Sequence, residues 1–114
     1  MSFLSFLFGS NTPQKNTITI LDKASFKIAI NTKKVQLFDV RTANEFNGGH
    51  IKNAKNIDLF NQSHFIKEFN KLNKEEQIYL YCRSGNRSQK AAKKLERLGF
   101  KNIFDLKGGY INWH

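Results

Sequence analysis

Residues 78–100 read IYLYCRSGNRSQKAAKKLERLGF and include Cys82, the single cysteine of this 114-residue chain. The segment 77–81, QIYLY, is nearly continuous in apolar residues, which is typical of a parallel strand that is covered on both faces. A helix is expected from Ser88, with apolar side chains on one face and lysines on the other. Gly99 suits the left-handed position that ends such a helix. The stretch therefore predicts a strand, a short loop and a helix.

Segments of the same two kinds alternate along the rest of the chain. Short β-branched or apolar runs predict further strands at 17–20, 35–40, 54–59 and 102–106. Helical spacing and capping residues predict helices at 22–31, 42–46 and 63–72. Asp22 is expected to cap the first of these helices, and Thr42 with Glu45 fits a capping box at the start of the second. This alternation indicates an α/β domain with a mostly parallel sheet.

The length of the chain suits one domain, because a chain of this size can bury about 65% of its unfolded surface. The first ten residues, MSFLSFLFGS, are apolar but too short to span a bilayer, and they lack the charged start of a signal peptide. Residues 1–16 are interpreted as an apolar tail and linker, and residues 17–114 as the folded domain. The tail is expected to be loose or to pack on itself, with contact to a membrane surface or a partner as the alternative.

The net charge of +10 raises the question of nucleic-acid binding. The lysines are spread along the chain, and no basic stripe interleaved with aromatic residues occurs, so nucleic-acid binding is not predicted as the function. The positive surface is instead expected to attract small anions. A single cysteine excludes an internal disulfide and a multi-cysteine zinc site, so no metal or cofactor is predicted. It fits a reducing compartment, and a cytoplasmic location is expected.

The loop that follows the predicted strand is suited to hold a reactive sulfur. In an open parallel sheet, ligands bind at the carboxyl ends of the strands, where Cys82 is expected to lie. Gly85 permits a tight curve that points backbone N–H groups inward, and the next helix adds partial positive charge. Arg83 and Arg87 add formal charge. These surroundings favour the thiolate, which is the nucleophilic form of cysteine.

The alternative is that Cys82 is a buried small residue at the end of a strand, which is common for free cysteine. Its neighbours argue against this interpretation, because two arginines, a glycine, a serine and an asparagine follow within five positions. Such residues are poor material for a core. The residues alone therefore favour a nucleophile that sits in an anion-binding loop.

Five short motifs occur in a fixed order, and together they resemble the single-domain rhodanese family of sulfurtransferases. They are DVR at 39–41, EF at 45–46, GHI at 49–51, CRSGNRS at 82–88 and GGYINW at 108–113. The resemblance extends over nearly all of residues 17–114. It implies a rhodanese-like α/β fold, in which a five-stranded parallel sheet is flanked by helices on both faces.

The resemblance also implies a reaction in two steps. The Cys82 thiolate would attack the outer sulfur of a small anionic donor such as thiosulfate, and a thiol or protein acceptor would then take the sulfur from the Cys82 persulfide. The persulfide would be held by the backbone of the loop residues Arg83, Ser84, Gly85, Asn86, Arg87 and Ser88. Arg83 and Arg87 are expected to bind the donor, and Arg87 also to tie the loop closed.

Residues from the other motifs are expected to support the loop. Asp39 and Arg41 would form hydrogen bonds and an ion pair around it, rather than take part in the chemistry. Glu45 either joins this network or only caps its helix. His50 is interpreted as structural, and Trp113 with the glycine pair 108–109 as packing and closure.

Three alternatives remain to be tested. A cysteine phosphatase is disfavoured, because such enzymes have a seven-residue loop whereas Cys82 to Arg87 spans six residues. A non-catalytic rhodanese-like binding module usually lacks the cysteine that is present here. A sulfur-relay protein would use the same chemistry with a protein acceptor, and the sequence does not distinguish it. With one cysteine, a persulfide cannot be resolved as an internal disulfide, so its sulfur must go to an outside acceptor.

Overall fold

The structure is a computed structural model that describes residues 16–114. The predicted apolar tail lies outside the described residues, so its interpretation stays a prediction. Five strands form one sheet in the order β1-β5-β4-β2-β3, and every neighbouring pair is parallel. The strands are β1 (Ile18–Leu21), β2 (Gln36–Asp39), β3 (Lys55–Asn56), β4 (Gln77–Tyr81) and β5 (Asn102–Leu106). The predicted five-stranded α/β fold is confirmed, and the sheet that was expected to be mostly parallel is parallel throughout.

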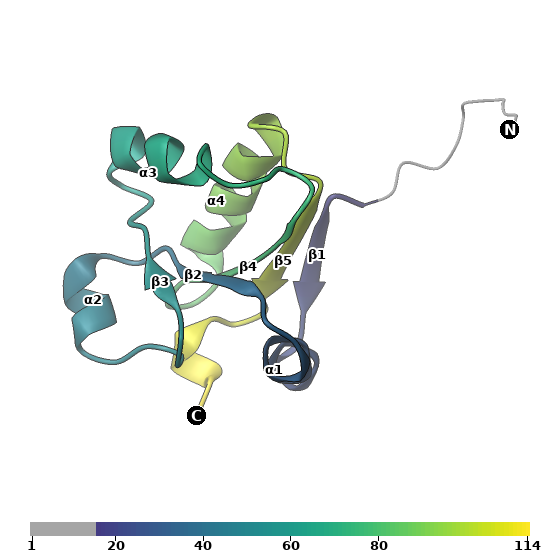
Figure 1. The fold of residues 1–114 in the computed structure, drawn as a ribbon. Helices are drawn as coiled ribbons and strands as arrows, with labels where there is room; N and C mark the ends of the chain where they lie inside the picture. The colour runs from purple at the N-terminus through teal and green to yellow at the C-terminus, as the bar shows by residue number, and fades with distance from the viewer. Residues whose placement is uncertain (1–15) are drawn as a thin grey trace, which may run out of the picture.

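Helices cover both faces of the sheet (Figure 1). They are α1 (Lys23–Thr32), α2 (Ala43–Asn47), α3 (Gln62–Phe69), α4 (Asn86–Arg97) and the short 3-10 helix η1 (Tyr110–Asn112). Helices α3 and α4 cover one face, where Phe65, Phe69 and Leu95 pack against strand residues such as Ile78. Helix α1 covers the other face, where the buried Phe26 meets Tyr79 edge to face. Two apolar cores therefore hold the sheet between them.

Three of the helix ends form as the sequence predicts. Asp22 accepts a hydrogen bond from the backbone of Ser25 at the start of α1. Thr42 and Glu45 form a complete capping box at the start of α2. At the end of α4, the N–H of Phe100 donates to the carbonyl of Leu95, and Gly99 has a φ of +102°. This is the Schellman arrangement that a glycine at this position favours.

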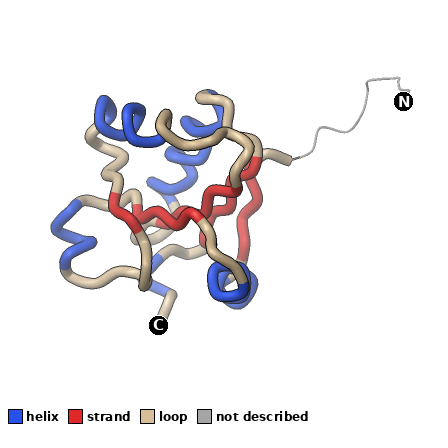
Figure 2. The backbone as a smooth tube through the Cα atoms, viewed as in Figure 1, coloured by secondary structure: helices blue, strands red, loops and turns tan. Residues whose placement is uncertain are grey.

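The structure corrects several predicted boundaries. Helix α4 begins at Asn86 and not at Ser88, because Gly85 has a φ of +109° and caps the helix from a left-handed conformation. Strand β3 covers only two residues of the predicted segment 54–59, and it lies between loops (Figure 2). Helix α3 ends at Phe69, three residues before Leu72, and β1 lies one residue later than predicted. Within residues 16–114, no helix has the length and apolar character to cross a membrane.

Candidate functional site

Cys82 directly follows β4, which lies between β5 and β2 in the sheet. Since all strands are parallel, this position is at the carboxyl edge of the sheet, where ligands bind in open α/β folds. The side chain is buried, with 1% of its surface exposed. Its sulfur accepts a hydrogen bond from the N–H of Gly85 at 3.1 Å and lies 3.5 Å from the hydroxyl oxygen of Ser88. The loop therefore curls around the sulfur atom.

The first turn of α4 faces this loop with free N–H donors. The first hydrogen bond of the helix runs from the N–H of Gln89 to the carbonyl of Gly85, so the N–H groups of Asn86, Arg87 and Ser88 have no acceptor within the helix. The first turn contains no acidic residue. The N-terminus of a helix carries partial positive charge, and this one lies beside the cysteine loop. The arrangement can therefore stabilise negative charge on sulfur.

Arg87 and Glu45 form a bidentate ion pair between α4 and α2. Nη1 of Arg87 lies 2.7 Å from Oε1 of Glu45, and Nη2 lies 2.8 Å from Oε2. These hydrogen bonds, together with those from Thr42, lower the pKa of Glu45 to about 2, against the opposing effect of burial. Glu45 thus both caps its own helix and holds the end of the cysteine loop. The side chain of Arg83, in contrast, is exposed.

Asp39 and Arg41 form a buried ion pair at the end of β2. Nη2 of Arg41 lies 2.6 Å from Oδ2 of Asp39, and Nε contacts both carboxylate oxygens. The same Nη2 donates to the carbonyl of Gly49 at 2.7 Å. Within residues 16–114, no hydrogen bond joins this pair to the cysteine loop itself. The pair instead fixes the segment that follows α2.

The segment after β5 forms a second wall of the loop. The N–H of Tyr110 donates to the carbonyl of Cys82 at 2.8 Å, and the N–H of Ile111 donates to the carbonyl of Arg83 at 3.0 Å. A Cβ atom on Gly109 would collide with the Arg83 carbonyl group and lie 2.7 Å from the oxygen of Cys82. Sequence reasoning assigned closure to the glycine pair. It missed these contacts because they join main-chain atoms and have no side-chain signature.

Asp105 is a residue near the site that sequence reasoning missed. It lies on β5 beside Leu80 of β4, and 1% of its surface is exposed. Burial raises the pKa of the carboxyl group to about 6, although the nearby Ser88 side chain acts in the opposite direction. The only available signal is an acidic residue within the otherwise apolar end of a strand, IFDL.

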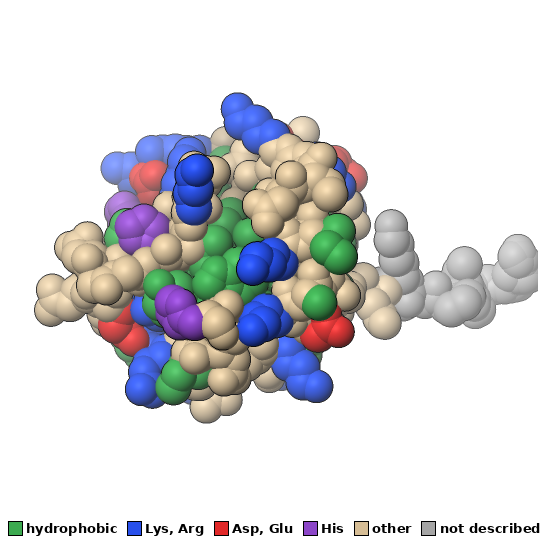
Figure 3. Space-filling view, turned by 90° about the horizontal axis from the view of Figure 1, so that it is seen from below, with side chains coloured by type: hydrophobic (Ala, Val, Ile, Leu, Met, Phe, Trp, Pro, Cys, Tyr) green, Lys and Arg blue, Asp and Glu red, His purple; other side chains and the backbone are tan. Residues whose placement is uncertain are grey.

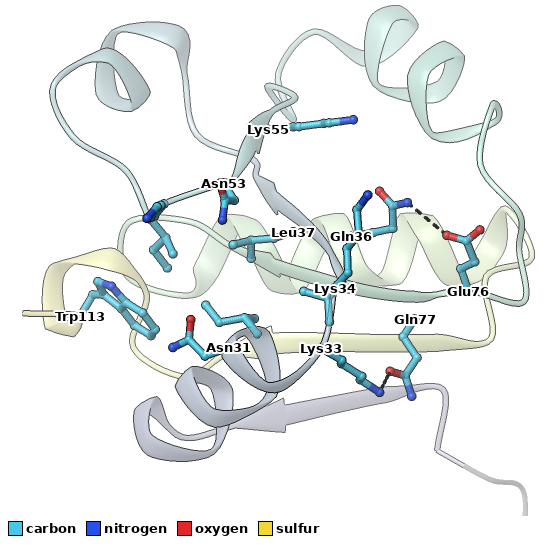
Figure 4. A pocket seen from close by; sticks show the side chains of 14 residues that line it. Asn31, Lys33, Lys34, Gln36, Leu37, Asn53, Lys55, Glu76, Gln77 and Trp113 are labelled. Atoms are coloured by element: carbon cyan, nitrogen blue, oxygen red, sulfur yellow. Dashed lines mark hydrogen bonds between the residues drawn. The ribbon is translucent and has the colours of Figure 1, made fainter.

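A separate hollow of about 980 Å³ is lined by residues of α1 and β2, by the first residues of β3 and β4, and by the loops beside them. Its lining includes the apolar side chains of Leu37, Ile51 and Trp113, and lysines lie around it (Figure 4). The space-filling view from below shows apolar side chains with lysine or arginine side chains beside them (Figure 3). Cys82 and its loop do not line this hollow. Of the sequence-predicted site residues, none is found there.

Known proteins are similar to this chain in both sequence and fold. A sequence model of the rhodanese-like domain matches residues 22–114. The Bacillus subtilis protein YqhL is 36% identical over 112 residues, which cover 98% of this chain and 85% of YqhL. The thiosulfate sulfurtransferase GlpE of Shewanella oneidensis is 38% identical over 82 residues, which cover 72% of this chain and 78% of GlpE.

A crystal structure of a rhodanese-like domain protein from Staphylococcus aureus superposes with a TM-score of 0.73 at 32% identity. The match covers 84% of this chain and 91% of that one. The fold, the family match and the identities agree with one another, so the chain belongs to the rhodanese-like domain family, which has sulfurtransferases among its members.

Proposed function

We propose that this protein transfers sulfane sulfur through a persulfide on Cys82. The observation that carries the proposal is the position of the sulfur atom, which lies inside the curled loop, 3.1 Å from the N–H of Gly85 and beside the N-terminus of α4. A thiolate there is stabilised by fixed donors, and so is a persulfide, which keeps a negative charge after sulfur is added. Residues 17–114 are proposed to be the domain that performs this reaction.

The reaction takes place in two steps. The Cys82 thiolate attacks the outer sulfur of thiosulfate, the S–S bond of the donor breaks, and sulfite leaves with the bonding electrons. An acceptor thiolate then attacks the outer sulfur of the persulfide, and Cys82 leaves again as a thiolate. Each step forms one bond to sulfur and breaks another, so no cofactor is needed.

The loop residues have different parts in this proposal. The N–H groups of Gly85, Asn86, Arg87 and Ser88 stabilise the charge of the persulfide, whereas the exposed side chain of Arg83 attracts the anionic donor. Ser84 is exposed in the loop, and the acceptor is proposed to approach the buried sulfur from this side. The guanidinium of Arg87 is engaged by Glu45, which supports a role in holding the loop closed.

Asp39 and Arg41 are proposed to support the loop from a distance. Their ion pair holds the carbonyl of Gly49, just after α2, and α2 carries the Glu45 carboxylate that binds Arg87. A shift of this segment would move Arg87 and with it the end of the loop. Small displacements of this kind cost catalytic rate because the reacting atoms must be closely aligned.

Thiosulfate is the proposed donor because the loop binds anions and because the related protein GlpE is a thiosulfate sulfurtransferase. A thiol or a protein is the proposed acceptor, since the described cysteine has no second cysteine in the chain to receive its sulfur. A free Cys82 thiol also suits the reducing environment of the cytoplasm, which is the proposed location.

Mass spectrometry of the intact protein tests this proposal. After incubation with thiosulfate, the protein should gain the mass of one sulfur atom, and cyanide should remove it with formation of thiocyanate. Cys82→Ser is the matched control and should show neither change. The proposal is wrong if the wild-type protein gains no sulfur from thiosulfate, polysulfide or mercaptopyruvate.

The same preparation separates the alternatives. Hydrolysis of an aryl phosphate at a comparable rate would favour a phosphatase. A protein that takes up sulfur but does not release it to small thiols would favour a sulfur relay to a protein acceptor.

A further inference from the structure

Asp105 lies on the face of the sheet that α3 and α4 cover. Ile103, two residues earlier on β5, belongs to the core beneath these helices, and alternate residues of a strand point to the same face. The Asp105 side chain is therefore directed toward α4. It is almost completely buried, and its Oδ1 atom has no hydrogen-bond partner within residues 16–114.

Ser88 lies between this carboxyl group and the cysteine. It is fully buried in the first turn of α4, and its hydroxyl is close enough to Asp105 to lower the pKa of the carboxyl group. On its other side, the Cys82 thiol donates to the Ser88 oxygen at 3.5 Å. The Ser88 hydroxyl itself donates to the carbonyl of Gly85 at 3.1 Å, and it can rotate to donate to Asp105 instead.

The surroundings of Asp105 provide no counter-charge. Its strand neighbours at the same level are Leu80 of β4 and Ile20 of β1, which are apolar. Arg87 of α4 is engaged by Glu45, and Tyr81 of β4 belongs to the core on the opposite face. Within residues 16–114, only burial and Ser88 shift the pKa of this carboxyl group.

A buried carboxylate without a partner destabilises the folded state. An apolar residue of similar size at this position would avoid the loss of stability. Groups of this kind cluster at functional sites, where their protonation has a use. The pKa of about 6 places the change of charge near neutral pH.

We propose that Asp105 accepts the proton of the Cys82 thiol through the hydroxyl of Ser88. This inference rests on the proposed use of Cys82 as a nucleophile. The S–H bond of Cys82 breaks as its proton moves to Ser88 Oγ, and the hydroxyl group of Ser88 rotates so that its own proton moves to the Asp105 carboxylate. One negative charge thereby passes from the carboxylate to the sulfur, and the total charge of the site is unchanged.

The sulfur atom has hydrogen-bond donors that the carboxyl group lacks. Oδ1 of Asp105 has no hydrogen-bond partner among residues 16–114, whereas the sulfur accepts from the N–H of Gly85 and lies beside the N-terminus of α4. Asp105 acts through Ser88 and does not touch the sulfur donor, so it is a positioning residue. The proton returns along the same path when Cys82 is regenerated as a thiol.

The pH dependence of Cys82 alkylation by iodoacetamide tests this proposal without any sulfur donor. In the wild-type protein, the alkylation rate should rise in a step near pH 6, where Asp105 ionises. Asp105→Asn should lose this step and react at least about tenfold more slowly at pH 7, as expected when a positioned base is removed. Ser88→Ala should behave in the same way.

Two variants serve as controls. Ser88→Thr keeps a hydroxyl group and should keep the step, which separates the proton path from packing. Glu96→Gln removes one carboxylate from the exposed side of α4, and it should leave the profile unchanged. Circular dichroism should show that each variant is folded, and the Ser88 pair keeps the test valid if Asp105→Asn does not fold.

The outcomes separate this inference from the proposed function. A wild-type pH profile in both Asp105→Asn and Ser88→Ala would overturn the proton path, even if sulfur loading is normal. A normal alkylation step in a wild-type protein that never takes up sulfur would overturn the sulfurtransferase proposal alone.

Discussion

Asp39 and Asp105 are both buried, and both lie toward the carboxyl edge of the same sheet, but their surroundings are opposite. Asp39 on β2 receives hydrogen bonds from the backbone and the guanidinium of Arg41 on both of its oxygens. Asp105 on β5 keeps one oxygen without a partner. In a medium of low dielectric constant, hydrogen bonds and counter-charges decide whether a buried carboxyl group stays ionised. The paired Asp39 carboxylate helps to hold the segment after α2, whereas the unpaired Asp105 carboxyl group is the one expected to exchange a proton.

The largest effect is expected from removing the partner of Asp39. Arg41→Ala leaves the Asp39 carboxylate buried without a counter-charge, and such losses cost about 3–5 kcal/mol in free energy of unfolding. Urea denaturation at pH 7 measures this change. The double variant Asp39→Asn/Arg41→Ala should recover part of the loss, because it removes the uncompensated charge. A loss below about 1 kcal/mol for Arg41→Ala would show that Asp39 is no better stabilised than Asp105.

Removing the charge of Asp105 is expected to raise the free energy of unfolding, which is the opposite of the effect of Arg41→Ala. The pKa of the Asp105 carboxyl group is raised from 3.8 to about 6, so the folded state binds a proton more tightly than the unfolded state. The stabilisation that this proton gives to the folded state is fully present below about pH 4 and is lost as the pH rises through about 6. Asp105→Asn avoids the buried charge and should be more stable than wild type at pH 7, by up to about 3 kcal/mol.

Denaturation curves at pH 4 and pH 7 check this sign. The difference between Asp105→Asn and wild type should be small at pH 4 and grow toward pH 7. An advantage of the variant that is equal at both values would point to packing and not to ionisation. A variant that is more stable but slower to alkylate would show that the carboxylate is kept for its reactivity.

The smallest effect on stability is expected at Glu45, whose carboxylate is paired, as that of Asp39 is, but only partly buried. Its ion pair with Arg87 is partly exposed, with 27% of the Glu45 side chain and 21% of the Arg87 side chain accessible. Glu45→Gln should lower the free energy of unfolding by about 1 kcal/mol at pH 7, because partly exposed pairs are screened by solvent. Glutamine retains the capping box, so the change isolates the pair with Arg87.

Acid titration of stability gives a second measurement at this position. The pKa of Glu45 is lowered from 4.5 to about 2, so its contribution is present above pH 4.5 and is lost as the pH falls toward 2. The difference between wild type and Glu45→Gln should shrink over this range. Glu45→Ala, which also removes the cap, should be less stable than Glu45→Gln at every pH above 4.5.

The regular elements could be predicted from local patterns. Strands β4 and β5 have the predicted bounds 77–81 and 102–106, because buried parallel strands are continuous runs of apolar residues. The capping box at Thr42 and the terminal Gly99 are equally local signals. The early start of α4 was missed because it depends on the left-handed conformation of Gly85, which residue types alone do not specify.

The contacts between distant elements could not be predicted. The cysteine loop was expected from its composition, but the ion pair of Arg87 with Glu45 depends on where α2 packs. The only sequence signal of Asp105 is an acidic residue in an otherwise apolar strand end, and it does not show that the side chain lies near Cys82. Its position under Ser88 arises from the strand order, which places β5 next to β4. Residues brought together by the sheet therefore complete a site of which the sequence shows only one segment.

The contact between Gly109 and the cysteine loop has an evolutionary consequence. The Arg83 carbonyl group leaves no space for a side chain at Gly109, and the next two residues hydrogen-bond the main chain of the loop. One residue inserted between Cys82 and Arg87 would press on this turn as well as widen the loop. A lineage could enlarge the loop only by remodelling both segments together. The size of the sulfur-binding loop is therefore protected against change by single insertions.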